Sequence, residues 1–132
     1  ITKIELERTA CYGICPVYKL SILRKGEIIY YGIKFVKITD IKKSKISMED
    51  FQKIADKIDK INFFEMMNEY RYKENRDGSR STVTDLPSTI TTVYKGNQKK
   101  RVLNYFGGPP GLEELENLID KISKVEEWIR GD

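Results

Sequence analysis

The sequence predicts an α+β fold, in which one antiparallel β-sheet of about six strands is packed by two amphipathic helices. Two patterns lead to this fold class. Apolar and polar residues alternate, as in half-buried strands, through the opening third of the chain and again over residues 88–106. Apolar residues recur at three- and four-residue spacing, as in helices, over residues 48–62 and 111–129. The expected element order is therefore β-β-β-β-α-β-β-α.

The first four strands are expected to form an antiparallel meander. In the first of them, the alternation turns Ile4 and Leu6 toward the core. Turn residues at 24–27 then separate two strands that form a hairpin. The last two segments of the meander are expected as one longer strand or two shorter ones. The strand segments of this region are residues 3–7, 17–23, 28–31, 34–38 and 41–46.

Both helices have recognisable beginnings. Ser47 can cap the first helix with its side-chain oxygen, and the side chain of Asp50, three residues later, can bond back to the Ser47 amide. The second helix follows a Gly-Gly-Pro-Pro-Gly corner at residues 107–111, where proline preorganises the first helical turn. The two proline residues remove amide donors, so we interpret this corner as structural and not as a phosphate-binding loop.

The connection between the first helix and the second hairpin is unusually long. Residues 67–87 show no periodicity and collect Asn, Asp, Gly and Ser, so we expect a loop that crosses the surface. Loops of about twenty residues in compact domains are functional or mobile. The hairpin that follows is expected to have strands at residues 88–94 and 99–106.

Length and composition favour one soluble globular domain over residues 1–132. The chain is 39% hydrophobic and 33% charged, and it has no apolar run of the ~20 residues that a membrane span needs. Ile1 in place of Met leaves room for a signal or anchor segment that has been removed.

The chain contains no histidine, which excludes histidine-based triads, Cys-His dyads and histidine metal ligands. General acid–base chemistry would have to use Asp, Glu, Tyr, Lys or Cys in a perturbed environment. Neither a Walker pattern nor a dinucleotide fingerprint is present. We therefore assign no catalytic residue, cofactor or metal site from the sequence.

The formal net charge of +4 is carried mainly by lysine, and eight tyrosines accompany it. Lysine excess with aromatic rings permits single-stranded nucleic-acid binding, although such tyrosines equally suit a core. The simpler interpretation of the lysines is solvated strand edges that oppose aggregation. The basic residues concentrate at Lys34, Lys37, Lys42, Lys43 and Lys45, and at Lys99, Lys100 and Arg101.

The only two cysteines, Cys11 and Cys15, are separated by three residues and lie between two expected strands. A structural disulfide is the simplest interpretation, because it closes a five-residue loop at a gain of about 2 kcal/mol. Gly13 would give that loop its backbone freedom. Three alternatives stay open: a redox couple, half of a zinc site, and buried reduced thiols.

Polar and aromatic residues near this loop are the candidate binding residues. Arg8, Tyr12 and Tyr18 flank the cysteines, and a guanidinium with two phenol rings can bind an anion or a ring. Asp85 lies in a polar turn, where its carboxylate can bond backbone amides or pair with a base.

The string from Glu7 to Tyr18, with its Cys-Tyr-Gly-x-Cys-Pro-x-Tyr motif, resembles the opening of an uncharacterised bacterial family, domain of unknown function 6438. Later blocks agree with it. They are residues 84–89, residues 104–107 with Pro109, and residues 112–120. The resemblance implies one compact domain of cell-envelope or lipoprotein contexts, and it implies no activity.

The leading hypothesis is a non-enzymatic binding or accessory domain of the cell envelope, outside the cytoplasm, with an unknown ligand or protein partner. A Cys11–Cys15 disulfide would staple the first strand connection, and the motif blocks would bring the binding residues together. A thiol redox module using Cys11 and Cys15 is the first alternative, and single-stranded nucleic-acid binding is the second. The candidate binding residues are Arg8, Tyr12, Tyr18, Asp85 and Tyr105.

Overall fold

The structure is a computed structural model and describes residues 1–131. Nine strands are present: β1 (Lys3–Arg8), β2 (Val17–Leu23), β3 (Glu27–Lys34), β4 (Ile41–Lys45), β5 (Glu69–Tyr70), β6 (Lys73–Glu74), β7 (Arg80–Ser81), β8 (Thr89–Lys95) and β9 (Gln98–Asn104). The helices are α1 (Met48–Lys60), the 3-10 helix η1 (Phe63–Glu65), α2 (Pro110–Ser123) and α3 (Glu126–Ile129).

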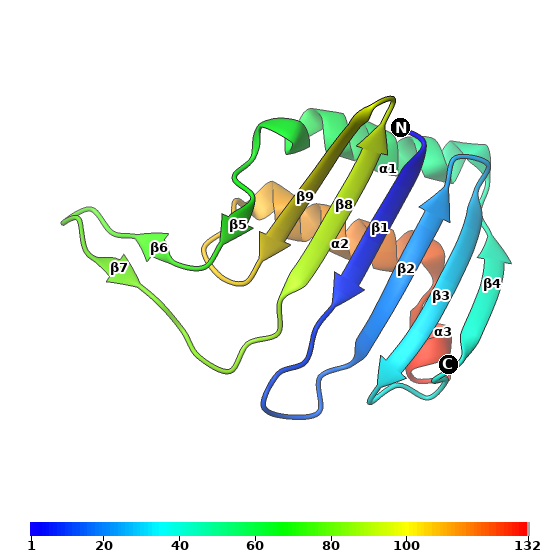
Figure 1. The fold of residues 1–132 in the computed structure, drawn as a ribbon, viewed down its shortest axis with the longest axis horizontal. Coiled ribbons are helices and arrows are strands. Elements are labelled where there is room, and N and C mark those ends of the chain that lie inside the picture. The colour runs from blue at the N-terminus through cyan, green and yellow to red at the C-terminus, as the bar shows by residue number, and fades with distance from the viewer. Residues whose placement is uncertain (132) are drawn as a thin grey trace.

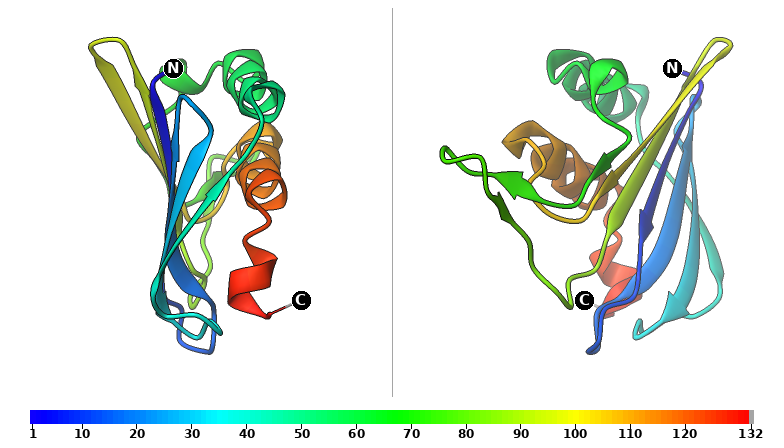
Figure 2. Two further views of the ribbon diagram at one scale, coloured as in Figure 1. Left: turned by 90° about the vertical axis from the view of Figure 1, so that its right-hand side faces the viewer. Right: turned by 60° about the vertical axis from the view of Figure 1, so that its left-hand side comes forward.

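Seven strands form one sheet in the order β4-β3-β2-β1-β8-β9-β5, and β6 pairs separately with β7. Neighbours in the large sheet are antiparallel except β5, which runs parallel to β9. Helices α1 and α2 lie on one face of this sheet (Figure 1 and Figure 2). The predicted α+β class, with a mostly antiparallel sheet and two main helices, is confirmed.

The first strand of the chain lies inside the sheet, between β2 and β8. Its register sets Ile4 opposite Ile22 on β2 and Val93 on β8, and all three are fully buried beneath the helices. The same register sets Arg8, the last residue of β1, opposite Tyr18 and Thr89. One end of an apolar strand face is therefore polar.

Helix α1 begins at the Ser47 cap that the sequence predicts, but within residues 1–131 the Asp50 carboxylate makes no return bond and instead lies 3.5 Å from Lys53 Nζ. The amide of Asp50 donates a hydrogen bond of 3.0 Å to the Ser47 side-chain oxygen. Phe51, Ile54 and Ile58 then follow on the face that packs on the sheet. The cap satisfies one of the free amides of the first turn, and the apolar stripe buries one side of the helix.

The predicted strand at residues 34–38 is wrong beyond its first residue, Lys34. Phe35 has a φ of 56°, a left-handed backbone that ends β3. The amide of Lys37 donates instead to the Ile129 carbonyl, and that of Ile38 to the Trp128 carbonyl. This segment is a loop, because its amides bond α3 in place of a strand.

The predicted helix at 111–129 is wrong as one continuous helix. The chain leaves α2 at Lys124, which has a φ of 57°, and starts again as the short helix α3. The break turns Trp128 toward the sheet, where its ring centroid lies 4.9 Å from that of Tyr30. It also buries Val125 completely.

The long connection at 67–87 contains three two-residue strands and is not a plain loop. In β5, Glu69 and Tyr70 extend the sheet by pairing with Leu103 and Asn104. Strands β6 and β7 form a hairpin arm that projects away from the sheet (Figure 1). Strands of two residues are too short to show a hydrophobic period, so the sequence does not reveal them.

Candidate functional site

The two cysteines form a disulfide between β1 and β2, with an S–S distance of 2.09 Å and a Cα–Cα distance of 5.8 Å. The loop that it closes is exposed, and Tyr12 and Ile14 keep 89% and 80% of their surface in solvent. The structural disulfide that the sequence predicts is therefore present in the protein. It closes the loop three residues after Arg8 and three residues before Tyr18.

Arg8, Tyr18 and Asp120 form a partly buried polar cluster between the sheet and α2. Arg8 Nη2 lies 2.7 Å from Asp120 Oδ2 in an ion pair, and the Tyr18 hydroxyl donates to the same carboxylate at 2.9 Å. Arg8 Nη1 donates to the Thr89 hydroxyl at 2.9 Å. The cluster joins two neighbouring strands and α2 through one carboxylate.

Burial sets the protonation behaviour of this cluster. It raises the pKa of Asp120, and the charge of Arg8 opposes the rise. Burial also raises the pKa of the Tyr18 hydroxyl, and the Asp120 carboxylate raises it further. Tyr18 therefore stays protonated at neutral pH and donates to Asp120. Most of the cluster's hydrogen bonds connect its own members, as in a structural clamp.

A cavity of about 360 Å³ lies beside the cluster. Its lining comes from the end of β1, the segment entering β8, the corner between β9 and α2, and the first turns of α2. Arg8 and Thr89 line one side, while Asn104 and Glu116 line another. The cavity is thus built at the polar end of an otherwise apolar layer.

Glu116 is the most unusual residue of this lining, because it is a carboxyl with only 3% of its surface exposed. Asn104 Nδ2 donates to its Oε2 at 2.9 Å. Within residues 1–131, Oε1 has no hydrogen-bond partner, and the one fully buried side-chain oxygen or nitrogen without a partner is that of Thr91. The unpartnered Oε1 is therefore open to the cavity.

The environment of Glu116 favours the protonated form of its carboxyl. Burial raises its pKa to about 7, while the Asn104 hydrogen bond and the charge of Arg8 hold the rise back. The nearby carboxylates of Glu113 and Asp120 add to the rise. Near neutral pH the carboxyl is divided between its neutral and charged forms.

Glycines at the corner before α2 shape the cavity wall. A Cβ on Gly108 would lie 2.9 Å from Asn104 Oδ1, so a side chain there would press on the amide that holds Glu116. Gly107 has a φ of 80°, and a Cβ there would collide with the Tyr72 carbonyl. The corner is structural, and its missing side chains leave the wall open.

The structure brings some of the candidate binding residues together and leaves others apart. Arg8 and Tyr18 share Asp120, and Tyr105 lines the cavity while its hydroxyl donates to the Val83 carbonyl at 2.7 Å. Tyr12 is exposed on the disulfide loop and does not line the cavity. Asp85 is exposed with a φ of 69°, and its side chain has no hydrogen bond within residues 1–131.

Sequence reasoning did not name four residues of the site as candidates, although each lies in a motif block of the family resemblance: Thr89, Asn104, Glu116 and Asp120. A signal for Glu116 is present in the spacing. It stands four residues after Leu112 and three before Ile119, which places a carboxyl on the apolar face of α2. The partners on β8 and β9 become visible only once the strands are paired.

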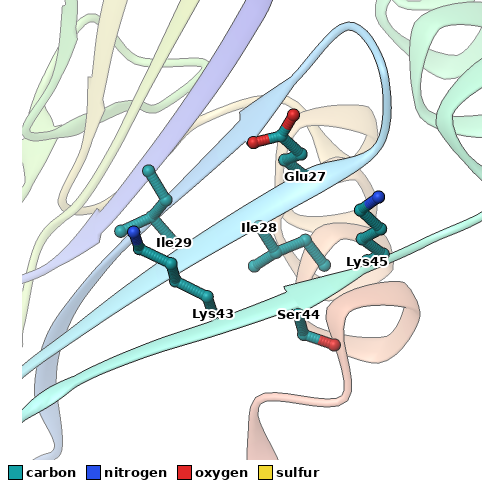
Figure 3. A pocket seen from close by; sticks show the side chains of 6 residues that line it. All are labelled: Glu27, Ile28, Ile29, Lys43, Ser44 and Lys45. Carbon is teal, nitrogen blue, oxygen red and sulfur yellow. The ribbon is translucent and has the colours of Figure 1, made fainter.

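A second depression, of about 320 Å³, lies at the other end of the sheet between β3 and β4. Figure 3 shows its lining, in which the isoleucines of β3 lie beside Lys43 and Lys45 of β4. All five residues of β4 are exposed. This is the charged strand edge that the lysine pattern indicates, and no buried polar group faces it.

Fold and site together define the class of protein: an α+β domain with a small, open polar cavity between its mixed sheet and α2. The chain belongs to the family described as Domain of unknown function (DUF6438), whose model matches residues 2–123. The resemblance noted in the motifs is confirmed, and every residue of the cavity falls in the matched range. No curated protein matches the chain. None of the helices in residues 1–131 is both long and apolar enough to cross a membrane.

Proposed function

We propose that this chain is a non-enzymatic binding domain of the cell envelope, and that the cavity beside Arg8 and Glu116 is its ligand site. Glu116 carries the proposal. Asn104 holds its side chain through Oε2, while Oε1 keeps solvent contact and has no hydrogen-bond partner within residues 1–131. A ligand hydroxyl can therefore bond Oε1 in place of water without disturbing the Asn104 hydrogen bond.

Binding is favoured over catalysis by how the reactive groups are arranged. The Asp120 carboxylate is occupied by Arg8 and Tyr18, and the Thr89 hydroxyl accepts from Arg8. A nucleophile needs a free base within hydrogen-bond reach. Glu116 Oε1 is free, but within residues 1–131 no hydroxyl or thiol is hydrogen-bonded to it. These groups support a preformed wall for a ligand.

The disulfide supports a location outside the cytoplasm. Disulfides persist in oxidising compartments and are rare in the cytosol. A thiol redox module remains the alternative, because the Cys11–Cys15 loop is exposed and open to reductants. Against it, both flanks of the loop are strands, whereas reactive thiolates are commonly stabilised at helix N-termini.

A fragment screen monitored by ¹H–¹⁵N NMR tests the ligand site. We expect small polar fragments to shift the amides of Asn104, Gly108 and Asn117. Gly108→Ala should weaken the affinity for those fragments at least tenfold, because the added methyl displaces the Asn104 side chain.

Gly13→Ala is the matched control for this screen, because a Cβ there would meet no heavy atom closer than 3.9 Å. It should leave binding unchanged. Fragments that bind Gly108→Ala as well as they bind the wild-type protein, or that never shift the cavity amides, would refute the site.

A further inference from the structure

We infer that the cavity takes a neutral, hydroxyl-bearing ligand of the size of a sugar ring. This inference rests on the proposed ligand site and names the chemistry of its occupant. Three features of the lining carry it: its balanced charge, its mixture of hydrogen-bond donors and acceptors, and its rings.

The charge of the lining favours neither an anion nor a cation. Arg8 is the cation of the cavity, and Asp120 already neutralises it at 2.7 Å. An anion entering beside Arg8 would also face the carboxyl groups of Glu113 and Glu116. A cation would meet the Arg8 guanidinium instead, so a neutral ligand avoids both repulsions.

The open hydrogen-bonding groups suit hydroxyls, each of which both donates and accepts. A guanidinium has five N–H donors, of which Arg8 directs one to Thr89 and one to Asp120. Asn104 Oδ1 has no hydrogen-bond donor within residues 1–131, and it lies beside the bare Gly108. Donors and acceptors therefore line the same small space.

Glu116 adapts to a hydroxyl in either protonation state. Its Oε2 accepts from Asn104, so a proton on the neutral carboxyl resides on Oε1 and points to the cavity as a donor. When the proton leaves, the same oxygen accepts. A hydroxyl complements both forms, whereas a protonated amine or a carbonyl complements only one.

Rings form part of the remaining wall. Pro87, Tyr105, Phe106 and Pro109 line the cavity beside its polar groups. Sugars present C–H faces as well as hydroxyl edges, and binding sites for small molecules combine apolar walls with a few placed polar groups. The rings and the hydrogen-bonding groups thus match the two kinds of surface of one sugar ring.

The test is an NMR titration of the full chain with glucose and N-acetylglucosamine as neutral probes, phosphate as the anion and spermidine as the cation. We expect a sugar to shift the amides of Asn104, Gly108 and Asn117 at millimolar to tens of millimolar concentration, and the ions to leave them unmoved. Glu116→Leu should weaken the affinity for the sugar at least tenfold.

A second variant and a second ligand form complete the test. Gly108→Ala keeps Glu116 and changes only the cavity wall, so it tests the inference even where Glu116→Leu does not fold. It should also weaken the binding of the sugar. The methyl glycoside distinguishes two sources, because a site for a sugar unit within a chain tolerates the methyl group and a site for a free sugar excludes it.

Each remaining outcome is decisive. If phosphate or spermidine shifts the cavity amides and loses affinity in Gly108→Ala, the ligand site stands and the neutral class is wrong. If neither sugar moves those amides, the inference fails, and the fragment screen alone then decides on the ligand site.

Discussion

At the scale of single residues, Glu116 occupies a position where an apolar side chain would stabilise the fold more. Burying a carboxyl costs free energy that one hydrogen bond from Asn104 recovers only in part. Its neighbours on the same face of α2, Leu112 and Ile119, are fully buried apolar residues. A costly carboxyl beside a cavity accords with a role in binding.

Asp120 is the residue on which the polar cluster depends. Asp120→Asn removes the charge that neutralises Arg8, and losing one partner of a buried ion pair costs 3–5 kcal/mol. Because the Arg8 and Asp120 side chains stay 22% and 21% exposed, we expect a loss of about 3 kcal/mol in the free energy of unfolding, at the lower end of that range. Urea denaturation measures it.

Glu126→Gln is the control for that measurement. It breaks an ion pair with Arg130 whose two side chains are more than 60% exposed, so its cost should stay below about 0.5 kcal/mol. A loss in Asp120→Asn no larger than this would show that the cluster does not hold α2 to the sheet.

At the scale of elements, the break between α2 and α3 depends on a residue poorly suited to it. Lys124 adopts the left-handed conformation that glycine favours at helix ends. Lys124→Gly should raise the free energy of unfolding by about 0.5–1 kcal/mol, since the relief of strain exceeds the entropy that glycine adds to the unfolded chain.

Thermal unfolding compares this variant with Lys121→Gly, which places glycine inside the last turn of α2 and should cost about 1 kcal/mol. Equal destabilisation by both glycines would mean that the helix does not break at Lys124 in solution.

The elements also show what the sequence reveals. The alternation in β1 and the capping by Ser47 predict a strand and a helix correctly, because both signals are local. Loop 35–40 and the break at Lys124 escape prediction, because each is stabilised by contacts with distant residues. Local patterns contain no information on those partners.

In the candidate site, too, the sequence reveals the residues with a local signal and not their distant partners. Arg8 and Tyr18 are visible beside the cysteine motif, and they do meet. Their partner Asp120 lies more than a hundred residues away in sequence, and it joins them only because β1 is inserted between β2 and β8. Sheet order is a long-range property, so spacing along the chain cannot reveal it.

At the scale of the whole molecule, the disulfide is a constraint on the unfolded chain. Cys11→Ser with Cys15→Ser should lower the free energy of unfolding by about 2 kcal/mol through loop entropy. The cavity amides should keep their chemical shifts, because neither cysteine lines the cavity. Free thiols in the freshly purified, denatured protein, detected by intact mass after alkylation, would instead favour the redox alternative.

The stability of the whole protein should depend on pH through Glu116. Its pKa rises on folding from 4.5 to about 7, so the folded state holds the proton more tightly. That contribution is complete below pH 4.5 and is lost as the pH rises through about 7. It amounts to about 3 kcal/mol at 1.36 kcal/mol per pKa unit.

Glu116→Gln isolates this effect, because it keeps the shape of the neutral carboxyl and cannot release the proton. The charged groups that act on Glu116, namely Arg8, Glu113 and Asp120, are present in both proteins. The difference between the two stability curves should therefore fall over this pH range, and a flat difference would contradict the buried carboxyl.

The most direct test of the account is a ¹³C NMR titration of the Glu116 side-chain carboxyl, because a buried carboxyl open only to the cavity is its central claim. We predict an inflection near pH 7 in the free protein, with burial as the main cause. The inflection should move when a cavity ligand is added. A pKa near the ordinary value of 4.5, unchanged by every ligand that binds, would show a hydrated surface carboxyl and contradict the site.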